Sequence, residues 1–346
     1  MKEIDIQSLA RENIKRLKPY SSARDDFEGT ASVFLDANEN PFPTDFNRYP
    51  DPHQKELKKE IARLKNVKPE QIFLGNGSDE AIDLFFRVFC EPGKDSVLAP
   101  QPTYGMYTVS AEINNIKIIS AQLTPAFQLD TDSLLKSVQP DTKLIFICSP
   151  NNPSANLINP KDIEVILNNF KGIVIIDEAY IDFSESPSWT TRISEFKNLA
   201  ILQTFSKAWG LAGLRVGMCF ANEEIIRLLN KIKPPYNINA FSQSETLRCI
   251  TSRKEGQIKM VTEIKTSREE LKKQLGTIKS VKKIFPSDAN FLLVEVDDAR
   301  SMYSKLIDKG IVVRDRSNVI LCDNCLRITV GTKEENKQLT QAISLL

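Results

Sequence analysis

The chain has 346 residues, of which 41% are hydrophobic and 26% charged, with a formal net charge of +1. These values are typical of a globular protein that can bury a large core in one large or two unequal domains. Charges of both signs are mixed, so no strong field would recruit nucleic acid or anionic lipid. No apolar run reaches the ~18 residues of a membrane span, and the polar first residues lack a signal-peptide core. We therefore expect a cytoplasmic protein with no nucleic-acid or membrane partner.

Cysteine and histidine usage restricts the chemistry. Six cysteines in a chain of this length do not form the dense pattern of a disulfide framework. Cys322 and Cys325 form a single C-x-x-C with no second pair and no nearby histidine, so we expect no metal site. His53, the only histidine, lies in a polar segment beside Pro52, which argues against Ser-His-Asp and Cys-His catalysis.

In chain order, residues 1–45 form an arm with a short predicted helix at 11–17 and several later prolines. An amphipathic helix is predicted over 53–66 and a short strand over 72–74, and this strand runs into a second amphipathic helix. Apolar strands then alternate with helices and turns, which favours a sheet buried on both faces in a large α/β domain over 46–245. These strands are predicted at 96–99, 117–120, 144–148, 173–176, 200–204 and 216–220.

The pattern changes after Pro234-Pro235. A long charged helix is followed by shorter strands and helices, which indicates a smaller α+β domain over 246–346. The predicted helices are 254–275, 300–309 and 333–344, and the predicted strands are 290–296, 311–313 and 326–330.

Polar motifs follow the strands of the large domain, where open α/β sheets bind their ligands. Gly77-Ser78-Asp79 opens a helix whose free N–H groups suit a phosphate, although simple capping by Ser78 or Asp79 is the alternative. Asn152, in Pro150-Asn151-Asn152-Pro153, either belongs to an ordinary Asn-Pro turn or donates a hydrogen bond to a ligand oxygen.

Asp177 ends a very apolar strand, so its carboxylate needs a cation or a hydrogen-bond donor. A protonated pyridine nitrogen is such a cation, and Tyr180, three residues later, could reach the same ring. A magnesium-binding aspartate, as in nucleotide hydrolases, and a structural ion pair are the alternatives.

The segment 204–217 (TFSKAWGLAGLRVG) places a lysine directly after a serine and an arginine eight residues later. Most lysines are solvated surface residues, but Lys207 lies among aromatic and small apolar residues. A desolvated lysine amine can attack a carbonyl, and the Ser206 hydroxyl and Arg215 guanidinium suit a phosphate. An aldehyde and a phosphate on one ligand describe pyridoxal phosphate.

With these residues, the chain resembles the fold-type-I, class-II-type pyridoxal-phosphate aminotransferases and, more narrowly, the histidinol-phosphate aminotransferases. The resemblance implies an α/β large domain with a mostly parallel central sheet flanked by helices, a small α+β domain, an arm packed with the small domain, and a homodimer. The narrower match rests on PYSSAR (19–24), ANENP (37–41), RYPD (48–51), GNGSDE (75–80), the segment 205–217, GIVVRD (310–315) and LRITVG (326–331).

The resemblance also implies site roles around the cofactor ring. Lys207 would bond covalently to pyridoxal 5'-phosphate and carry the proton that moves during transfer. Asp177 would keep the pyridine nitrogen protonated, Asn152 and Tyr180 would hydrogen-bond the phenolic oxygen, and Tyr104 would stack on the ring.

Further roles concern the phosphate and the substrate. The phosphate cradle would comprise Ser78, Asp79, Ser206 and Arg215, with Tyr49 reaching it from the other subunit. The substrate would meet Tyr20, Arg314 and Arg327, although a surface ion pair is the plainer interpretation of the two arginines. Many relatives have glycine where Ala155 stands, two residues after Pro153. A left-handed backbone there would not suit alanine.

The resemblance favours a transaminase that converts histidinol phosphate and 2-oxoglutarate to imidazole-acetol phosphate and glutamate in histidine biosynthesis. An aromatic-amino-acid aminotransferase and a threonine-phosphate decarboxylase of the same fold remain alternatives. A non-catalytic pyridoxal-phosphate-sensing domain is a further one, but the chain lacks the length and basic segment for an added helix-turn-helix domain. A nucleotide-binding enzyme would need a glycine-rich phosphate motif that the sequence does not contain.

Overall fold

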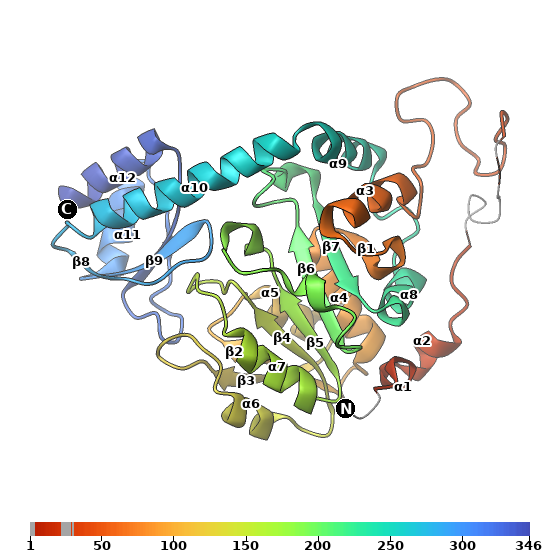
Figure 1. Cartoon of the computed structure of the whole chain (residues 1–346), viewed down its shortest axis with the longest axis horizontal. Helices are drawn as coiled ribbons and strands as arrows, with labels where there is room; N and C mark the ends of the chain where they lie inside the picture. The colour runs from red at the N-terminus through yellow and green to blue at the C-terminus, as the bar shows by residue number, and fades with distance from the viewer. Residues whose placement is uncertain (1–3, 22–28, 30) are drawn as a thin grey trace.

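The computed structural model describes residues 4–21, 29 and 31–346. The chain forms a large domain, with the small C-terminal domain and the projecting N-terminal arm at its opposite ends (Figure 1). Among the described helices, none combines the length and the apolar character that crossing a bilayer requires.

The large domain is built on a seven-stranded sheet in the order β1-β7-β6-β5-β4-β2-β3. Only β7 runs against its neighbours, β1 and β6, so the prediction of a mostly parallel sheet is confirmed. The strands are β1 (Ile72–Asn76), β2 (Ser96–Gln101), β3 (Lys117–Gln122), β4 (Thr142–Cys148), β5 (Ile173–Asp177), β6 (Leu199–Thr204) and β7 (Val216–Ala221).

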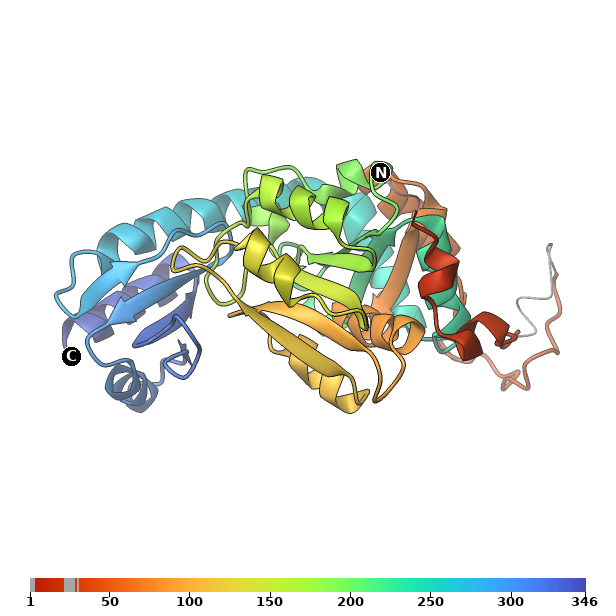
Figure 2. The same ribbon diagram turned by 90° about the horizontal axis from the view of Figure 1, so that it is seen from below.

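Helices cover both faces of this sheet (Figure 2). Successive side chains of a strand point to opposite faces, so Ile145 joins one hydrophobic cluster and Phe146 the other. The first cluster includes α3 (Lys55–Lys65), α6 (Thr131–Ser137) and α7 (Pro160–Asn169). The second includes α4 (Ser78–Phe89), α5 (Met106–Ile113) and α8 (Glu223–Ile232). The two helical layers cover the faces of the sheet but not the carboxyl ends of its parallel strands.

The small domain is a four-stranded antiparallel sheet in the order β10-β11-β9-β8, packed against α10, α11 and α12. The long α10 starts beside α9 and runs to this sheet. The predicted domain border between residues 245 and 246 falls inside α9, where no break in the chain marks it, and it stays a prediction. The elements are α9 (Ala240–Ser252), α10 (Lys254–Leu275), β8 (Val281–Ile284), β9 (Phe291–Val296), α11 (Ala299–Asp308), β10 (Arg314–Asp315), β11 (Cys325–Thr329) and α12 (Lys333–Ser344).

The predicted packing of the arm against the small domain is wrong for its described helices, α1 (Ile6–Leu9) and α2 (Glu12–Arg16). Ile6 and Ile14 are buried in the cluster of α4 and α8, and Arg11 pairs with Glu91 at 3.1 Å. Apolar side chains on one face of these helices therefore anchor the arm on the large domain. Residues 22–24 of the 19–24 motif lie outside the described residues.

Candidate active site

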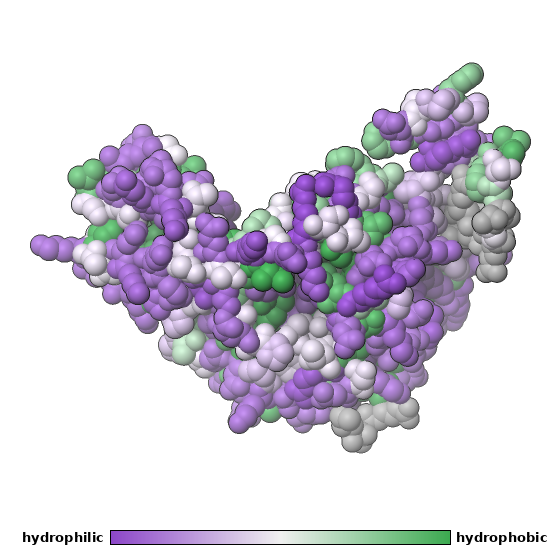
Figure 3. All heavy atoms as spheres, turned by 45° about the horizontal axis from the view of Figure 1, so that its top comes forward, coloured by the Kyte–Doolittle hydropathy of each residue, from purple (hydrophilic) through white to green (hydrophobic). Residues whose placement is uncertain are grey.

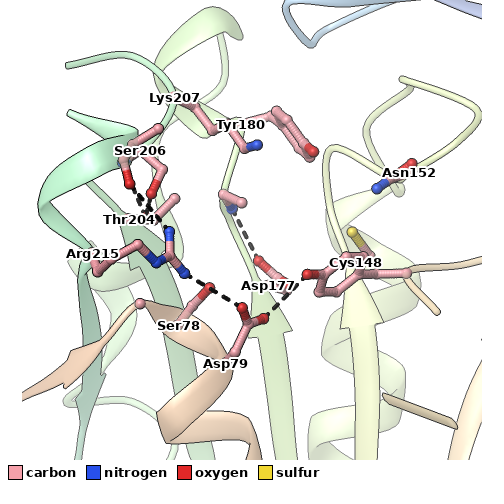
Figure 4. A pocket seen from close by; sticks show the side chains of 14 residues that line it. Ser78, Asp79, Cys148, Asn152, Asp177, Tyr180, Thr204, Ser206, Lys207 and Arg215 are labelled. Carbon is pink, nitrogen blue, oxygen red and sulfur yellow. Dashed lines mark hydrogen bonds and ion pairs between the residues drawn. The ribbon is translucent and has the colours of Figure 1, made fainter. Parts of the chain in front are cut away.

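A cavity of about 280 Å³ lies at the carboxyl ends of β4, β5 and β6. It brings together every residue predicted to contact the cofactor except Tyr49. The lining consists of Gly77, Ser78, Asp79, Tyr104, Cys148, Asn152, Asp177, Ala179, Tyr180, Thr204, Ser206, Lys207, Ala212 and Arg215. Figure 4 shows hydroxyls and a guanidinium at one side, with Lys207 and Asp177 at different ends.

One side of the cavity suits an anion. Helix α4 starts at Ser78 after Gly77, and no side chain caps its first N–H groups, so the capping alternative does not hold. Arg215 and the hydroxyls of Ser78 and Ser206 surround the same space (Figure 4). Uncapped helix N–H groups, the helix dipole and a guanidinium together favour a phosphate.

Asp79 contacts two residues on the anion-binding side of the cavity, Tyr104 and Arg215. Its Oδ1 accepts a hydrogen bond from the Tyr104 hydroxyl at 3.1 Å, and its Oδ2 lies 3.6 Å from Nη2 of Arg215. A carboxylate repels a phosphate, so the side chain of Asp79 is suited to holding Tyr104 and Arg215 in place. Only its backbone N–H is suited to the anion itself.

Two glycines allow the anion-binding turn to form. Gly77 adopts a φ of +78°, and a Cβ there would lie against the Arg215 guanidinium. A Cβ on Gly217, in β7, would overlap the backbone of Gly77 and Ser78. The strand and the helix start can approach this closely only because both positions lack side chains.

We expect Gly217→Ala to lower the free energy of unfolding by about 1–3 kcal/mol, because the new methyl group forces the two backbones apart. Binding of a phosphate anion should weaken with it, since the start of α4 moves. Thermal unfolding and titration with inorganic phosphate measure the two effects. Gly213→Ala is the matched control, because a Cβ there meets no atom within 4 Å. Equal behaviour of the two variants would contradict this account.

Asp177 is buried at the end of β5 and has no ion-pair partner among the described residues. Its Oδ2 accepts a hydrogen bond from the Tyr107 hydroxyl at 2.8 Å and its Oδ1 from the Ala179 N–H at 3.1 Å. Burial raises the pKa of Asp177 to about 6, against the opposing effect of these two hydrogen bonds. Within the described residues, no group of three or more His, Cys, Asp or Glu side chains is arranged to hold a metal ion. The carboxylate is suited to pairing with a cation supplied by a ligand.

Lys207 follows β6 and lines the cavity, where its side chain is still exposed in the single chain. Partial burial, followed by the charge of Arg327, lowers the pKa of Lys207, and the charge of Asp177 opposes the change. Its Nζ lies 5.7 Å from the centre of the Tyr180 ring. A lowered pKa increases the fraction of neutral amine, which is the nucleophilic and basic form.

One side chain of the small domain bonds to the cavity lining. Nη1 of Arg327, in β11, donates a hydrogen bond to Oδ1 of Asn152 at 2.6 Å. The Arg327 guanidinium also lies over the Phe291 ring, 5.4 Å from its centre, and Tyr180 packs edge-on against the same ring. Arg327 therefore contacts the cavity lining from the small domain through a hydrogen bond to Asn152, and not through a surface ion pair.

Arg327 bonds to the lining residue Asn152 but is not itself part of the cavity lining. Three further predicted residues do not line the cavity of their own chain. Arg314 is exposed and lies opposite Arg327 in the β10–β11 pair. Tyr49 stacks on Tyr236 with ring centres 4.5 Å apart, and Tyr20 borders a separate cavity formed by the arm and α8. Their predicted contacts are therefore absent within the described part of a single chain.

Thr204, Cys148 and Tyr107 were not predicted to belong to the site. Thr204 and Cys148 end strands β6 and β4, so the rule that placed Asp177 would have found them. The sequence contains only a weak indication for Tyr107, which stands three residues after Tyr104 in the first turn of a helix.

Ala155 does adopt the left-handed conformation, with a φ of +70°. Its N–H donates to the Asn151 carbonyl and its own carbonyl accepts from the Asp288 N–H, at 2.8 and 2.7 Å. These bonds hold the turn that presents Asn152 despite the cost of about 1–2 kcal/mol for a side chain in this region.

The chain is similar to known proteins over nearly its whole length. A family model described as "Aminotransferase class I and II" matches residues 30–343. Two proteins named histidinol-phosphate aminotransferase, from Christiangramia forsetii and Parabacteroides distasonis, are 53% and 54% identical to the chain. The alignments cover 100% of this chain and 99% of the first relative, and 98% of both chains for the second. The crystal structure of the histidinol-phosphate aminotransferase from Clostridium acetobutylicum superposes with a TM-score of 0.79 at 26% identity, covering 86% of this chain and 90% of that one.

Proposed function

Since the chain belongs to the class I and II aminotransferases and, within them, to the histidinol-phosphate aminotransferases, we propose that it transfers an amino group between histidinol phosphate and 2-oxoglutarate. The products would be imidazole-acetol phosphate and glutamate, and the step belongs to histidine biosynthesis. The observation that carries the proposal is the single cavity that joins Lys207, Asp177 and the anion-binding start of α4.

The residues of this cavity fit pyridoxal 5'-phosphate. The uncapped start of α4 and Arg215 suit its phosphate, and the unpaired, buried carboxylate of Asp177 suits the protonated nitrogen of its ring. When bound, the cofactor supplies an aldehyde that condenses with amines and a ring that accepts electron density from the substrate carbon.

Lys207 performs the proton transfers. Its lowered pKa leaves more of the amine neutral at Nζ, so it can accept the proton from the substrate carbon and return it during transfer. Asp177 holds the proton on the ring nitrogen through its charged carboxylate. Asn152 and Tyr180 would hold the phenolic oxygen of the cofactor by hydrogen bonds, and Tyr104, whose hydroxyl donates to Asp79, would stack on its ring.

Arg327 would bind the anionic group of either substrate. A guanidinium forms paired hydrogen bonds with a carboxylate or with a phosphate, so one arginine can hold glutamate or histidinol phosphate in turn. The hydrogen bond from Arg327 to Asn152 is compatible with this role, because it uses only Nη1 and leaves the other guanidinium N–H groups able to donate to a substrate. We also assign substrate contacts to Arg314 and Tyr20.

We further propose a homodimer in which Tyr49 reaches the phosphate of the partner's cofactor and Tyr20 is placed near substrate by the same assembly. The arm exposes large apolar side chains, among them Leu35 (87% exposed) and Phe42 (73%), as an element that packs on another subunit would (Figure 3). Sedimentation should give twice the mass of 39.1 kDa. All six cysteines are free and buried, which is consistent with our placing the enzyme in the cytoplasm.

Half-reactions with single amino donors test which substrate the enzyme uses. We expect histidinol phosphate to convert the cofactor-loaded enzyme rapidly to the aminated form, followed spectroscopically, and phenylalanine and threonine phosphate to react at least about ten times more slowly. Faster conversion by phenylalanine would indicate an aromatic-amino-acid aminotransferase. Release of carbon dioxide from threonine phosphate would indicate the decarboxylase. Binding of the cofactor with no reaction of any amine would indicate a sensing domain.

A further inference from the structure

Tyr107, in the first turn of α5, is fully buried behind the cavity and does not line it. Its ring stacks on Phe146 with centres 4.8 Å apart and planes 19° apart, and it meets Tyr104 edge-on at 5.6 Å. These two contacts fix the ring, so the position of its hydroxyl oxygen is also fixed.

The Tyr107 hydroxyl donates to Oδ2 of Asp177 across 70 residues of sequence. The Ala179 N–H donates to the other oxygen, Oδ1. A carboxylate with one fixed donor on each oxygen cannot rotate without losing a hydrogen bond, and each oxygen keeps a further lone pair for a ligand. The pair of donors therefore sets the plane of the carboxylate.

We propose that Tyr107 is a positioning residue for Asp177, which orients the carboxylate toward the ring nitrogen of the cofactor and keeps it charged in a buried site. This inference rests on the proposed function, because it concerns the same cofactor. Tyr107 acts only through Asp177 and touches neither cofactor nor substrate.

The electrostatic surroundings of Asp177 make this hydrogen bond important. Burial raises the pKa of Asp177, and the Tyr107 hydrogen bond is the largest effect that lowers it. The other titratable groups that act on the carboxylate, or on which it acts, are Asp79, Tyr104, Cys148, Tyr180 and Lys207. Of these, only Lys207 can carry a positive charge, and its effect on the pKa of Asp177 is weaker than that of burial, of either hydrogen bond or of Asp79. Loss of the hydroxyl would therefore leave the charged carboxylate with little compensation.

The test is Tyr107→Phe, which keeps the stack on Phe146 and removes only the hydroxyl. We expect the acid-side midpoint of pyridoxal 5'-phosphate binding to the apoprotein to move up by about one pH unit, as loss of one hydrogen bond to a charged group implies. The value of kcat should fall by about tenfold or more, with KM for glutamate little changed. Tyr303→Phe, on α11 of the small domain, is the matched control and should leave both quantities unchanged.

A double-mutant cycle separates positioning from packing. In an Asp177→Asn background, removal of the Tyr107 hydroxyl should have little further effect on cofactor binding, because no carboxylate remains to be charged. An equal effect of Tyr107→Phe in both backgrounds, or an unchanged midpoint in the single variant, would overturn the inference. If the wild-type protein does not bind pyridoxal 5'-phosphate, the proposed function itself fails, and that outcome is visible before any variant is made.

Discussion

Lys207→Ala is expected to lower the rate of amino-group transfer by about 10⁴-fold or more, because in the proposed function one amine is both the covalent anchor and the proton carrier. The wild-type protein should be yellow, with an absorbance band that shifts as pH changes, and the variant should lose this pH-dependent band. The cradle formed by α4 and Arg215 is untouched, so weak binding of the cofactor should persist. Absorbance spectra across a pH series and steady-state rates measure these effects.

Two further variants show whether the amine or the charge is required. Lys207→Arg keeps a positive charge of similar length but cannot act as a base near neutral pH, so we expect it to be as inactive as Lys207→Ala. Lys171→Ala, an exposed lysine before β5, should retain full activity. Borohydride reduction followed by mass spectrometry should find the cofactor on Lys207. An adduct on another side chain would refute the assignment.

The parts of the fold that followed from the sequence are those with a strong local pattern. Helices α10 and α12 have the predicted bounds, and β1 to β7 extend their predicted apolar runs by a few residues at most. Strand β8 was missed because it pairs along an exposed edge with two lysines at its centre, so it has no apolar run. The predicted strand at 311–313 was wrong, since pairing with β11 starts only at Arg314.

The cavity could be predicted because its residues follow the ends of buried strands, where a polar side chain has no role in the core. Long-range partners could not be predicted, because local patterns contain no information on contacts between distant segments. Tyr107 bonds to Asp177 across 70 residues and Arg327 to Asn152 across 175. The packing of the arm could not be predicted for the same reason, since the apolar face of Ile6 and Ile14 could have packed on either domain.

Asp177→Asn is expected to lower the rate of transfer by about 10²- to 10³-fold, because a neutral amide cannot hold a proton on the ring nitrogen. The same change should stabilise the apoprotein at alkaline pH. The pKa of Asp177 is about 6 in the folded chain, against 3.8 for an unperturbed aspartate. The folded state thus binds this proton more tightly than the unfolded state. Its contribution to stability is fully present below pH ~4 and is lost as pH rises through about 6.

Above that range the charged, buried carboxylate disfavours the folded apoprotein by up to about 3 kcal/mol, which asparagine avoids in part. The difference in Tm between Asp177→Asn and the wild type should therefore be largest at pH ~8 and should shrink as pH falls toward ~4. Asp308→Asn, an exposed carboxylate on α11, should show no such trend. A pH-independent difference in Tm would mean that Asp177 is not desolvated, whereas full activity of Asp177→Asn would remove the carboxylate from the mechanism. Loss of activity together with gain of stability would show that this buried charge is kept for catalysis at the expense of the fold.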